Sequence, residues 1–345
     1  MTETKATQAF ALAGRVPACK LSHSYRSLPP ALAVCLATAA WGQTPFGLKG
    51  PHRPGMMSST AASAKPPADT PASAQYRFIT IGVPGSPDAQ AAGINNDGLV
   101  SGWYQDASSS SVYHGFVWQA GVFQTVDYPG ALYTYLFAVN NRGVAVGLYG
   151  DGTAEYAVMY SVLGGTWRVL PDIPGYPENE GYGINDAGDA VGNAYSADFS
   201  TSVAWIWHAG TSAYSFFTVP GAAPYSTSPS GINDKGQVAG YFNNSSGVEY
   251  GFLKQGRTYA TFELPGASAT GPNGINNNGM IVGQWRDEAG AAQGFVLTSG
   301  GLFTTVDYPG PSLTAVEGIN DHGDISGVYV EEPSGARKAY VGLRK

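Results

Sequence analysis

The sequence contains little cysteine, little charge and no long apolar run. Its two cysteines, Cys19 and Cys35, both precede residue 76, so residues 76–345 can form no disulfide bond. Charged residues make up only 12% of the chain. The apolar run at residues 31–40 is shorter than the roughly 20 residues that a membrane-spanning helix needs. These absences exclude a small disulfide-stapled domain and predict no transmembrane segment.

The sequence also lacks the residues that several common kinds of catalytic or metal site require. Residues 76–345 hold three histidines, His114, His208 and His322, and no two have the spacing of zinc ligands. They contain no Gly-x-Ser-x-Gly elbow, no cysteine nucleophile and no phosphate-binding glycine loop before a helix. Asp and Glu outnumber Lys and Arg there by 23 to 11, which repels nucleic acid. We therefore expect no nucleic-acid partner, no metal site and no cofactor, with Ca²⁺ held by carboxylates as the exception left open.

Residues 1–41 have the features of an export signal. Basic residues precede the apolar run and small residues end it, as in a signal peptide region (Arg15, Lys20 and Arg26, then Ala37 and Ala39). A disordered tail with a chance apolar stretch is the alternative. Residues 32–35 weakly resemble a lipoprotein processing site at Cys35. Residues 42–75 are rich in Pro, Ala, Ser and Thr and predict a disordered linker.

The feature that the sequence has in abundance is one short phrase rich in Asn, Asp and Gly. Its six copies, of the form Gly-Ile-Asn-Asp-x-Gly, are residues 93–98, 138–143, 183–188, 231–236, 274–279 and 318–323. The steps between copies are 45, 45, 48, 43 and 44 residues. This period is the length of one β-propeller blade.

Each repeat contains four strand-like pieces, which we call A to D. Strand A runs into the phrase, whose Asn-x-x-Gly end predicts a tight A–B turn. Strand B carries an interior glycine, strand C is short and apolar, and strand D ends at Pro-Gly. Residues 78–85 form a strand D without its own A, B and C, whereas the chain stops after a strand C. The N-terminal strand therefore completes the last blade, and residues 76–345 predict an all-β fold, a closed six-bladed β-propeller of four-stranded blades.

The pattern resembles a known family. The repeated phrase, the glycine-containing strand rich in Val and Ile, and the later Gly-Phe-Val or Gly-Phe-Leu are similar to the bacterial extracellular repeats called the HAF family. The resemblance covers residues 76–345. It implies an exported bacterial protein, secreted, periplasmic or on the cell surface, and it implies no particular reaction.

A second pattern follows the interior glycine of strand B. An aromatic residue comes two positions after this glycine, and an acid or amide two positions later, so both side chains share one face of the strand near the variable B–C loops. Aromatic rings stack on sugars, and carboxylates bind hydroxyl groups or Ca²⁺. In the other interpretation the aromatic packs between blades and the acid caps its own loop. The pairs are Tyr104/Asp106, Tyr149/Asp151, Phe242/Asn244, Trp285/Asp287 and Tyr329/Glu331.

Residues that break the repeat are further candidates, because residues shared by all blades usually serve the blade. Blade three has Ala194 where the others have an aromatic. We assign no catalytic residue. The ligand-binding candidates are Tyr104, Asp106, Tyr149, Asp151, Glu180, Asp198, Trp285, Arg286, Asp287, Tyr329 and Glu331.

Three functions remain open. The leading hypothesis is an exported, non-catalytic, monomeric binding module that takes a glycan or a cell-surface protein on its variable loops. The second is a carbohydrate-active hydrolase or lyase, in which we expect two or more acids with raised pKa values to converge in a pocket. The third is a structural cell-envelope repeat protein with near-uniform blades. Exposed aromatic residues at the rim would favour the first.

Overall fold

The structure is a computed structural model that describes residues 75–345, except 87, 110–111, 311–312 and 332. In this described part the chain forms twenty-four β-strands and no α-helix. None of the described residues therefore belongs to a helix that could cross a membrane. The predicted signal peptide region and nearly all of the predicted linker lie outside the described residues.

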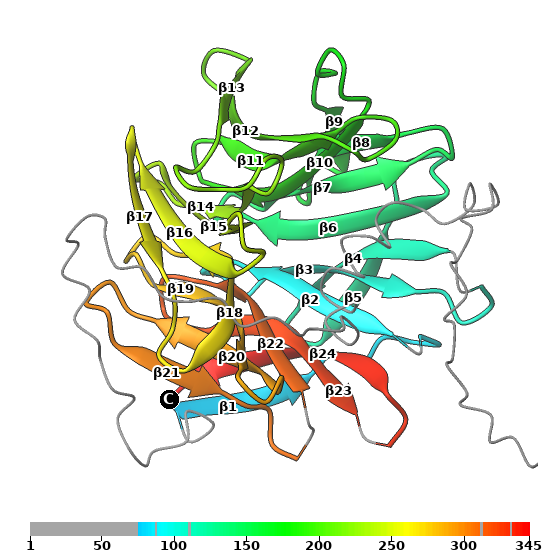
Figure 1. The fold of residues 1–345 in the computed structure, drawn as a ribbon. Coiled ribbons are helices and arrows are strands. Elements are labelled where there is room, and N and C mark those ends of the chain that lie inside the picture. Colours follow the sequence, from blue (N-terminus) through cyan, green and yellow to red (C-terminus); the bar gives the residue numbers. More distant parts are fainter. Residues whose placement is uncertain (1–74, 87, 110–111, 311–312, 332) are drawn as a thin grey trace, which may run out of the picture. The chain divides into compact units, whose positions relative to one another are not determined.

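The strands form six four-stranded antiparallel sheets that follow one another around an axis in chain order (Figure 1). The first three blades, each in the order A to D, are β2 (Ala89–Ile94), β3 (Val100–Gln105), β4 (Tyr113–Gln119) and β5 (Val122–Val126); β6 (Tyr133–Val139), β7 (Val144–Gly150), β8 (Glu155–Ser161) and β9 (Thr166–Val169); and β10 (Glu178–Ile184), β11 (Ala190–Tyr195), β12 (Ser202–His208) and β13 (Ala213–Phe217). The A strands of neighbouring blades contact one another, so strand A is innermost.

The last three blades repeat this arrangement. They are β14 (Ser228–Ile232), β15 (Gln237–Asn243), β16 (Glu249–Gln255) and β17 (Thr258–Phe262); β18 (Ala267–Ile275), β19 (Ile281–Asp287), β20 (Ala292–Leu297) and β21 (Phe303–Val306); and β22 (Leu313–Ile319), β23 (Ile325–Glu331), β24 (Ala336–Arg344) and β1 (Tyr76–Thr80).

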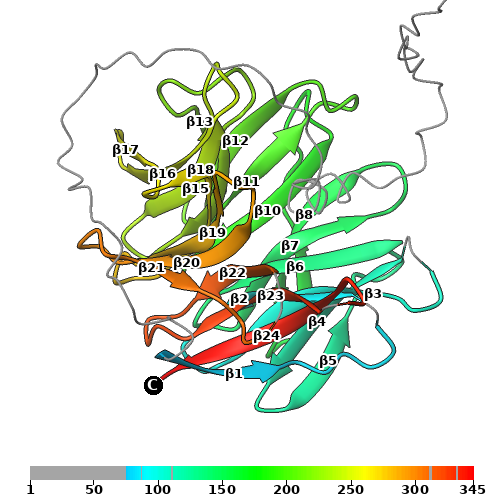
Figure 2. The same cartoon turned by 60° about the horizontal axis from the view of Figure 1, so that its bottom comes forward.

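The N-terminal strand completes the last blade. β1 pairs antiparallel with β24, from Tyr76 opposite Arg344 to Thr80 opposite Tyr340. The C-terminus accordingly lies beside β1 in both views (Figures 1 and 2). The predicted all-β fold, a six-bladed propeller of four-stranded blades closed by its N-terminal strand, is confirmed.

An ion pair strengthens the seam that this closure creates between blade six and blade one. Arg337 on β24 reaches Asp88, just before β2, with 2.7 Å from Nε to Oδ1 and 2.5 Å from Nη2 to Oδ2. The guanidinium group also lies 5.0 Å from the centre of the Trp103 ring. A bidentate pair of this kind fixes orientation as well as adding attraction.

Every strand A carries a β-bulge at the residue before its phrase, which begins with glycine in five blades and with Ala138 in blade two. In β2 the pairing register shifts between Ala91 and Gly93, and in β10 between Gly181 and Gly183. A bulge takes one residue out of the ladder and re-aims its side chain. The glycine after it is needed because the A strands crowd together: a Cβ on Gly183 would lie 2.8 Å from the Cα of Gly231 in the next blade.

Candidate functional site

The two ends of the propeller are built from different connections. The D–A linkers bond to the ends of strand B: Leu132 N donates to Gly150 O over 2.8 Å, and Ala223 N donates to Asn243 O over 2.8 Å. The D–A linkers and the B–C loops therefore share one end, which we call the loop face. The A–B turns, which contain the repeated phrase, lie at the opposite end, the turn face.

At the turn face, the first Asn of each phrase makes two kinds of hydrogen bond. In blade one, Asn95 Oδ1 accepts from the backbone N–H groups of Asp97 and Leu99, at 3.0 and 2.9 Å, which closes its own turn. Its Nδ2 donates to the backbone oxygen of Asn140 in the next blade. All six bonds of the second kind measure 2.9–3.2 Å and form a closed belt (Asn95, Asn140, Asn185, Asn233, Asn276 and Asn320).

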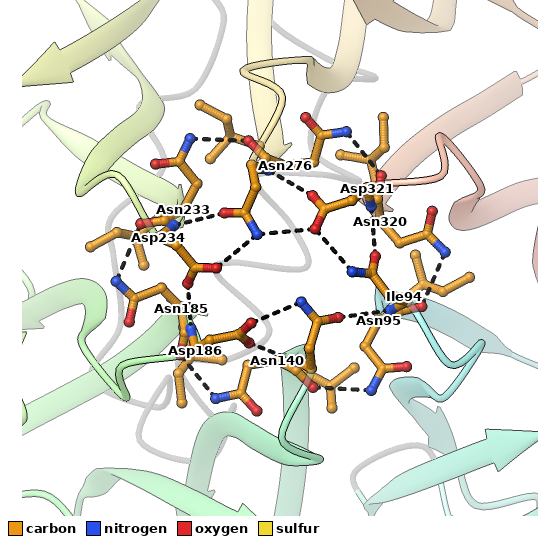
Figure 3. Close-up of a pocket in the computed structure, with 18 residues that line it drawn as sticks. Ile94, Asn95, Asn140, Asn185, Asp186, Asn233, Asp234, Asn276, Asn320 and Asp321 are labelled. Atoms are coloured by element: carbon orange, nitrogen blue, oxygen red, sulfur yellow. Dashed lines mark hydrogen bonds between the residues drawn. The ribbon is translucent and has the colours of Figure 1, made fainter.

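The next residue of each phrase forms a second ring (Figure 3). Each of its backbone N–H groups donates to the side-chain Oδ1 of the following blade, at 2.7–2.8 Å. Asn and Asp both supply an Oδ1. The Asn members also donate from Nδ2 to Asp members, as Asn141 does to Asp186 at 3.0 Å. The six residues, Asn96, Asn141, Asp186, Asp234, Asn277 and Asp321, line a cavity of about 60 Å³.

A collar of branched apolar residues closes this cavity on its inner side. These residues line both the turn-face cavity and a second cavity deeper on the axis, which we call the inner chamber. The collar consists of Ile94, Val139, Ile184, Ile232, Ile275 and Ile319, all at most 8% exposed.

The inner chamber is lined by the six bulged residues and has a volume of about 70 Å³. This position differs in every blade, in contrast to the phrase that follows it. From blade one to blade six it holds Ala92, Phe137, Tyr182, Ser230, Asn273 and Glu317. Burial raises the pKa of the Glu317 carboxyl to about 7, although the nearby charge of Arg337 acts in the opposite direction.

Three glutamates converge in the seam between blades two and three. Glu155, Glu178 and Glu180 are 0%, 6% and 1% exposed. Glu155 N donates to Glu178 Oε2 over 2.7 Å, and Tyr133 Oη donates to Glu155 Oε1 over 3.0 Å. Burial first, and then the charge of Glu155, raises the pKa of Glu180 well above its ordinary value. Burial also raises the pKa of Glu178.

The ligand-binding candidate Glu180 belongs to this buried cluster. The hydroxyl of Tyr182 donates to its carboxyl group, and the Tyr182 and Tyr195 hydroxyls lie 3.2 Å apart. Because Tyr182 also lines the inner chamber, the cluster is linked to the axis through this side chain.

The predicted aromatic candidates pack between blades or against their own strand D. Tyr149 stacks on Tyr128 of the preceding D–A linker, with ring centres 3.7 Å apart. Tyr329 stacks on Tyr308 in the same way at 3.9 Å. Trp285 meets Phe303 edge-on at 5.6 Å. The Tyr104 hydroxyl lies 2.9 Å from Thr125 Oγ1 on β5.

The acids two positions later cap their own B–C loops. Asp106 Oδ1 accepts from Ser108 N over 2.6 Å, Asp151 Oδ1 from Thr153 N over 2.8 Å, and Asp287 Oδ1 from Ala291 N over 2.9 Å. Hydrogen bonds from Ser108 and Thr153 lower the pKa values of Asp106 and Asp151. Glu331 Oε2 lies 3.3 Å from Ser334 Oγ. These contacts fit the loop-capping interpretation, and a direct role in ligand binding stays a prediction.

Two charged groups face each other across the seam between blades four and five. Burial raises the pKa of Glu249, at the start of β16, to about 7, and the charge of Arg286 opposes this shift. The candidate Arg286 itself has a lowered pKa because it is partly buried.

His114 on blade one lies between two carboxylates. Its Nδ1 is 2.8 Å from Asp127 Oδ2, and its Nε2 is 3.3 Å from Asp106 Oδ2. Nowhere in the described part do three or more His, Cys, Asp or Glu side chains gather in an arrangement that could hold a metal ion.

Two exposed aromatic residues on the loop face were not among the candidates predicted from the sequence. Phe199, in the B–C loop of blade three, is 40% exposed, and Tyr225, in the D–A linker that follows, is 59% exposed. Their φ angles are +56° and +60°. The available signal was the step of 48 residues between phrases three and four, which lengthens the segment that carries Tyr225.

Comparisons with known proteins show a similarity of fold and nothing further. No family model matches the chain, and no curated protein matches it. A putative TolB from Agrobacterium tumefaciens has a TM-score of 0.51 and 13% identity, covering 78% of this chain and 97% of that chain. A mutant of AofleA from Arthrobotrys oligospora has a TM-score of 0.49 and 13% identity, over 77% and 86% of the two chains. The Aleuria aurantia lectin, a six-bladed β-propeller, has a TM-score of 0.46 and 11% identity, over 76% and 93%.

Proposed function

We propose that the chain is an exported, non-catalytic binding module that holds a glycan on its loop face, between blades three and four. The observation that carries this proposal is the pair Phe199 and Tyr225, two large aromatic residues exposed at positive φ. Positive φ is rare for bulky residues and costs roughly 1–2 kcal/mol, so such residues gather at functional sites.

The two residues are connected through the end of blade three. Ser202 pairs with Tyr195 in the sheet, and Ser202 Oγ donates to Tyr225 O over 2.9 Å. The Tyr195 ring lies 5.7 Å from the Phe199 ring. The Phe199 ring and the Tyr225 backbone are therefore both attached to the ends of β11 and β12, which reduces the ordering that ligand binding requires.

Polar groups suited to sugar hydroxyls lie beside these rings. Asp198 Oδ1 accepts from Ser196 Oγ and Ser200 Oγ, both at 2.7 Å. These bonds lower the pKa of Asp198 to about 2, so its carboxylate is charged at neutral pH. A carboxylate and hydroxyl groups next to flat aromatic faces suit a pyranose ring, which has apolar faces and a polar edge. The sequence candidate Asp198 thus keeps its proposed role in ligand binding.

The buried glutamates argue against catalysis as the main function. An enzyme should bring acids with raised pKa values together in a pocket, and blades two and three do bring such acids together. However, Glu155 and Glu180 are 0% and 1% exposed, so a substrate cannot reach their carboxyl groups in this conformation. A carbohydrate-active hydrolase or lyase remains the second candidate because these acids converge.

A glycan and polysaccharide array tests the proposal, with and without Ca²⁺ and with product release scored in parallel. We expect wild-type protein to bind at least one glycan, and Tyr225→Ala and Phe199→Ala each to weaken binding at least tenfold. Phe216→Ala is the matched control, because Phe216 is a 54% exposed aromatic on the outer strand of the same blade. This variant should bind as wild type does.

Each other outcome points to a different function. Release of reducing sugar or unsaturated product, lost in Glu180→Gln, would replace the binding module by an enzyme. Capture of a purified cell-surface protein without any glycan signal, again dependent on Tyr225, would keep the site and change the ligand class. No ligand of either kind would favour a structural cell-envelope protein.

A further inference from the structure

The inner chamber contains polar oxygens that lack a protein partner. No hydrogen bond within the described residues reaches the Glu317 carboxylate, the Ser230 hydroxyl or the Asn273 Oδ1, although Asn273 Nδ2 donates to Val316 O over 3.1 Å. These three oxygen-bearing side chains come from consecutive blades, four to six. The three side chains are half-buried, so water or a ligand in the chamber can reach these oxygens and satisfy them.

The chamber carries a negative charge when Glu317 is ionised, and its lining contains no positive residue. Glu317 is the only charged residue among the lining residues, which include no Lys or Arg. The nearby Arg337 is paired with Asp88, at 2.7 Å from Nε to Oδ1. An ionised carboxylate in a cavity whose lining offers no counter-ion is costly, so a bound cation would stabilise it.

The opposite half of the chamber is apolar and aromatic. Blades one to three contribute Ala92, Phe137 and Tyr182, and the Phe137 and Tyr182 rings meet edge-on with centres 5.5 Å apart. The Tyr182 hydroxyl donates to Glu180, so its ring rather than its oxygen is offered to the chamber. An aromatic face attracts a cation that carries hydrogen or methyl groups.

We propose that the inner chamber is a binding site for a small organic ammonium ion. Glu317 supplies the charge, Ser230 Oγ and Asn273 Oδ1 accept N–H donors, and Phe137 and Tyr182 contact the alkyl part. The volume of about 70 Å³ suits a group of a few heavy atoms, since one water needs roughly 10–15 Å³ on the same measure. A bare Ca²⁺ ion needs six to eight oxygen ligands, which these side chains do not provide. This site is separate from the proposed glycan site.

Isothermal titration of the full-length protein with methylammonium chloride tests the proposal, with K⁺ and Ca²⁺ as comparison ions. We expect saturable binding of one methylammonium per chain, and Glu317→Gln to weaken it at least tenfold. The matched control is Asp234→Asn, which removes one negative charge from the axis on the other side of the collar. Its affinity should stay within about twofold of wild type.

Three results would overturn the proposal. An equal loss in Glu317→Gln and Asp234→Asn would mean that the general negative field, and not the chamber, attracts the ion. Stronger binding of Ca²⁺ or K⁺ would define a metal site instead. Absence of saturable methylammonium binding in a protein whose thermal unfolding is normal would show that the chamber holds only water.

Discussion

Two cavities lie on the same axis, separated only by the apolar collar, and they are built in opposite ways. In the turn-face ring every Oδ1 accepts a hydrogen bond from the preceding blade, and its residues are nearly constant. In the inner chamber the residue changes in every blade, and oxygens on three blades have no hydrogen-bond partner among the residues that the structure describes. The comparison teaches that the residues that join the blades recur in all six repeats, whereas the position just before them varies, and there we place the proposed ligand.

The largest effect should come from breaking the belt of Asn residues. Asn233→Ala removes a donor to Asn276 O at 3.0 Å and the acceptor of two turn N–H groups, at a position only 3% exposed. We expect a loss of about 2–4 kcal/mol in the free energy of unfolding, measured in urea. Lys235→Ala, at an exposed position in the same turn, should change it by less than about 0.5 kcal/mol. Similar losses in both variants would refute the role of the belt.

The next effect concerns pH, because several carboxyl groups that the blades bury have raised pKa values. Glu180 is raised well above 4.5, and Glu249 and Glu317 are raised to about 7. Raised folded-state pKa values favour the protonated, folded form. The stability they give is therefore complete below pH 4.5 and is lost as pH rises through about 7. We expect the free energy of unfolding to fall by roughly 2–3 kcal/mol between pH 5 and pH 8. A flat profile over this range would contradict the burial of these acids.

A smaller effect, a gain in stability, should follow when the acid in the inner chamber is neutralised. Glu317→Gln replaces a carboxyl that must ionise inside the protein by a neutral amide of the same shape. At pH 8 we expect it to raise the free energy of unfolding by about 1 kcal/mol, seen as a higher midpoint of thermal unfolding. At pH 5 both quantities should stay unchanged. Loss of stability at both values would mean that Glu317 joins blades, as the turn-face residues do.

The smallest effect should appear at the loop face. Phe199→Gly relieves a positive φ, so we expect a gain of up to about 1 kcal/mol in stability together with loss of glycan binding. Ala197→Gly in the same loop is the control, because Ala197 is not among the residues at positive φ. It should lower stability slightly and keep binding. A gain in stability without any loss of binding would remove Phe199 from the proposed site.

The fold could be predicted from the sequence because its signals are local and repeated. The Asn-x-x-Gly turns, the period and the unpaired strand at residues 78–85 together determine a closed ring of six blades. The inner chamber could not be predicted in this way, because the bulge that turns Tyr182 or Glu317 to the axis depends on pairing register. Glu180 illustrates the same limit: its departure from the repeat made it a ligand-binding candidate, but the sequence did not show that packing between blades two and three buries it. Likewise, turn chemistry explained only half of what Asn95 does, since its other bond reaches the next blade.

The most direct test of the account compares two Asn residues three positions apart in blade five. Asn276 belongs to the belt: its Nδ2 donates to Asn320 O over 2.9 Å, and its Oδ1 accepts from the backbone N–H groups of Asn278 and Met280. Asn273 lines the inner chamber and makes a single bond to the next blade, from Nδ2 to Val316 O over 3.1 Å, while its Oδ1 faces the chamber. The measurement is the free energy of unfolding of Asn276→Ala and Asn273→Ala in urea. The account predicts a loss of about 2–4 kcal/mol for the first and less than about 1 kcal/mol for the second. Equal losses, or a larger loss at Asn273, would contradict the division of the axis into a scaffold ring and a ligand chamber.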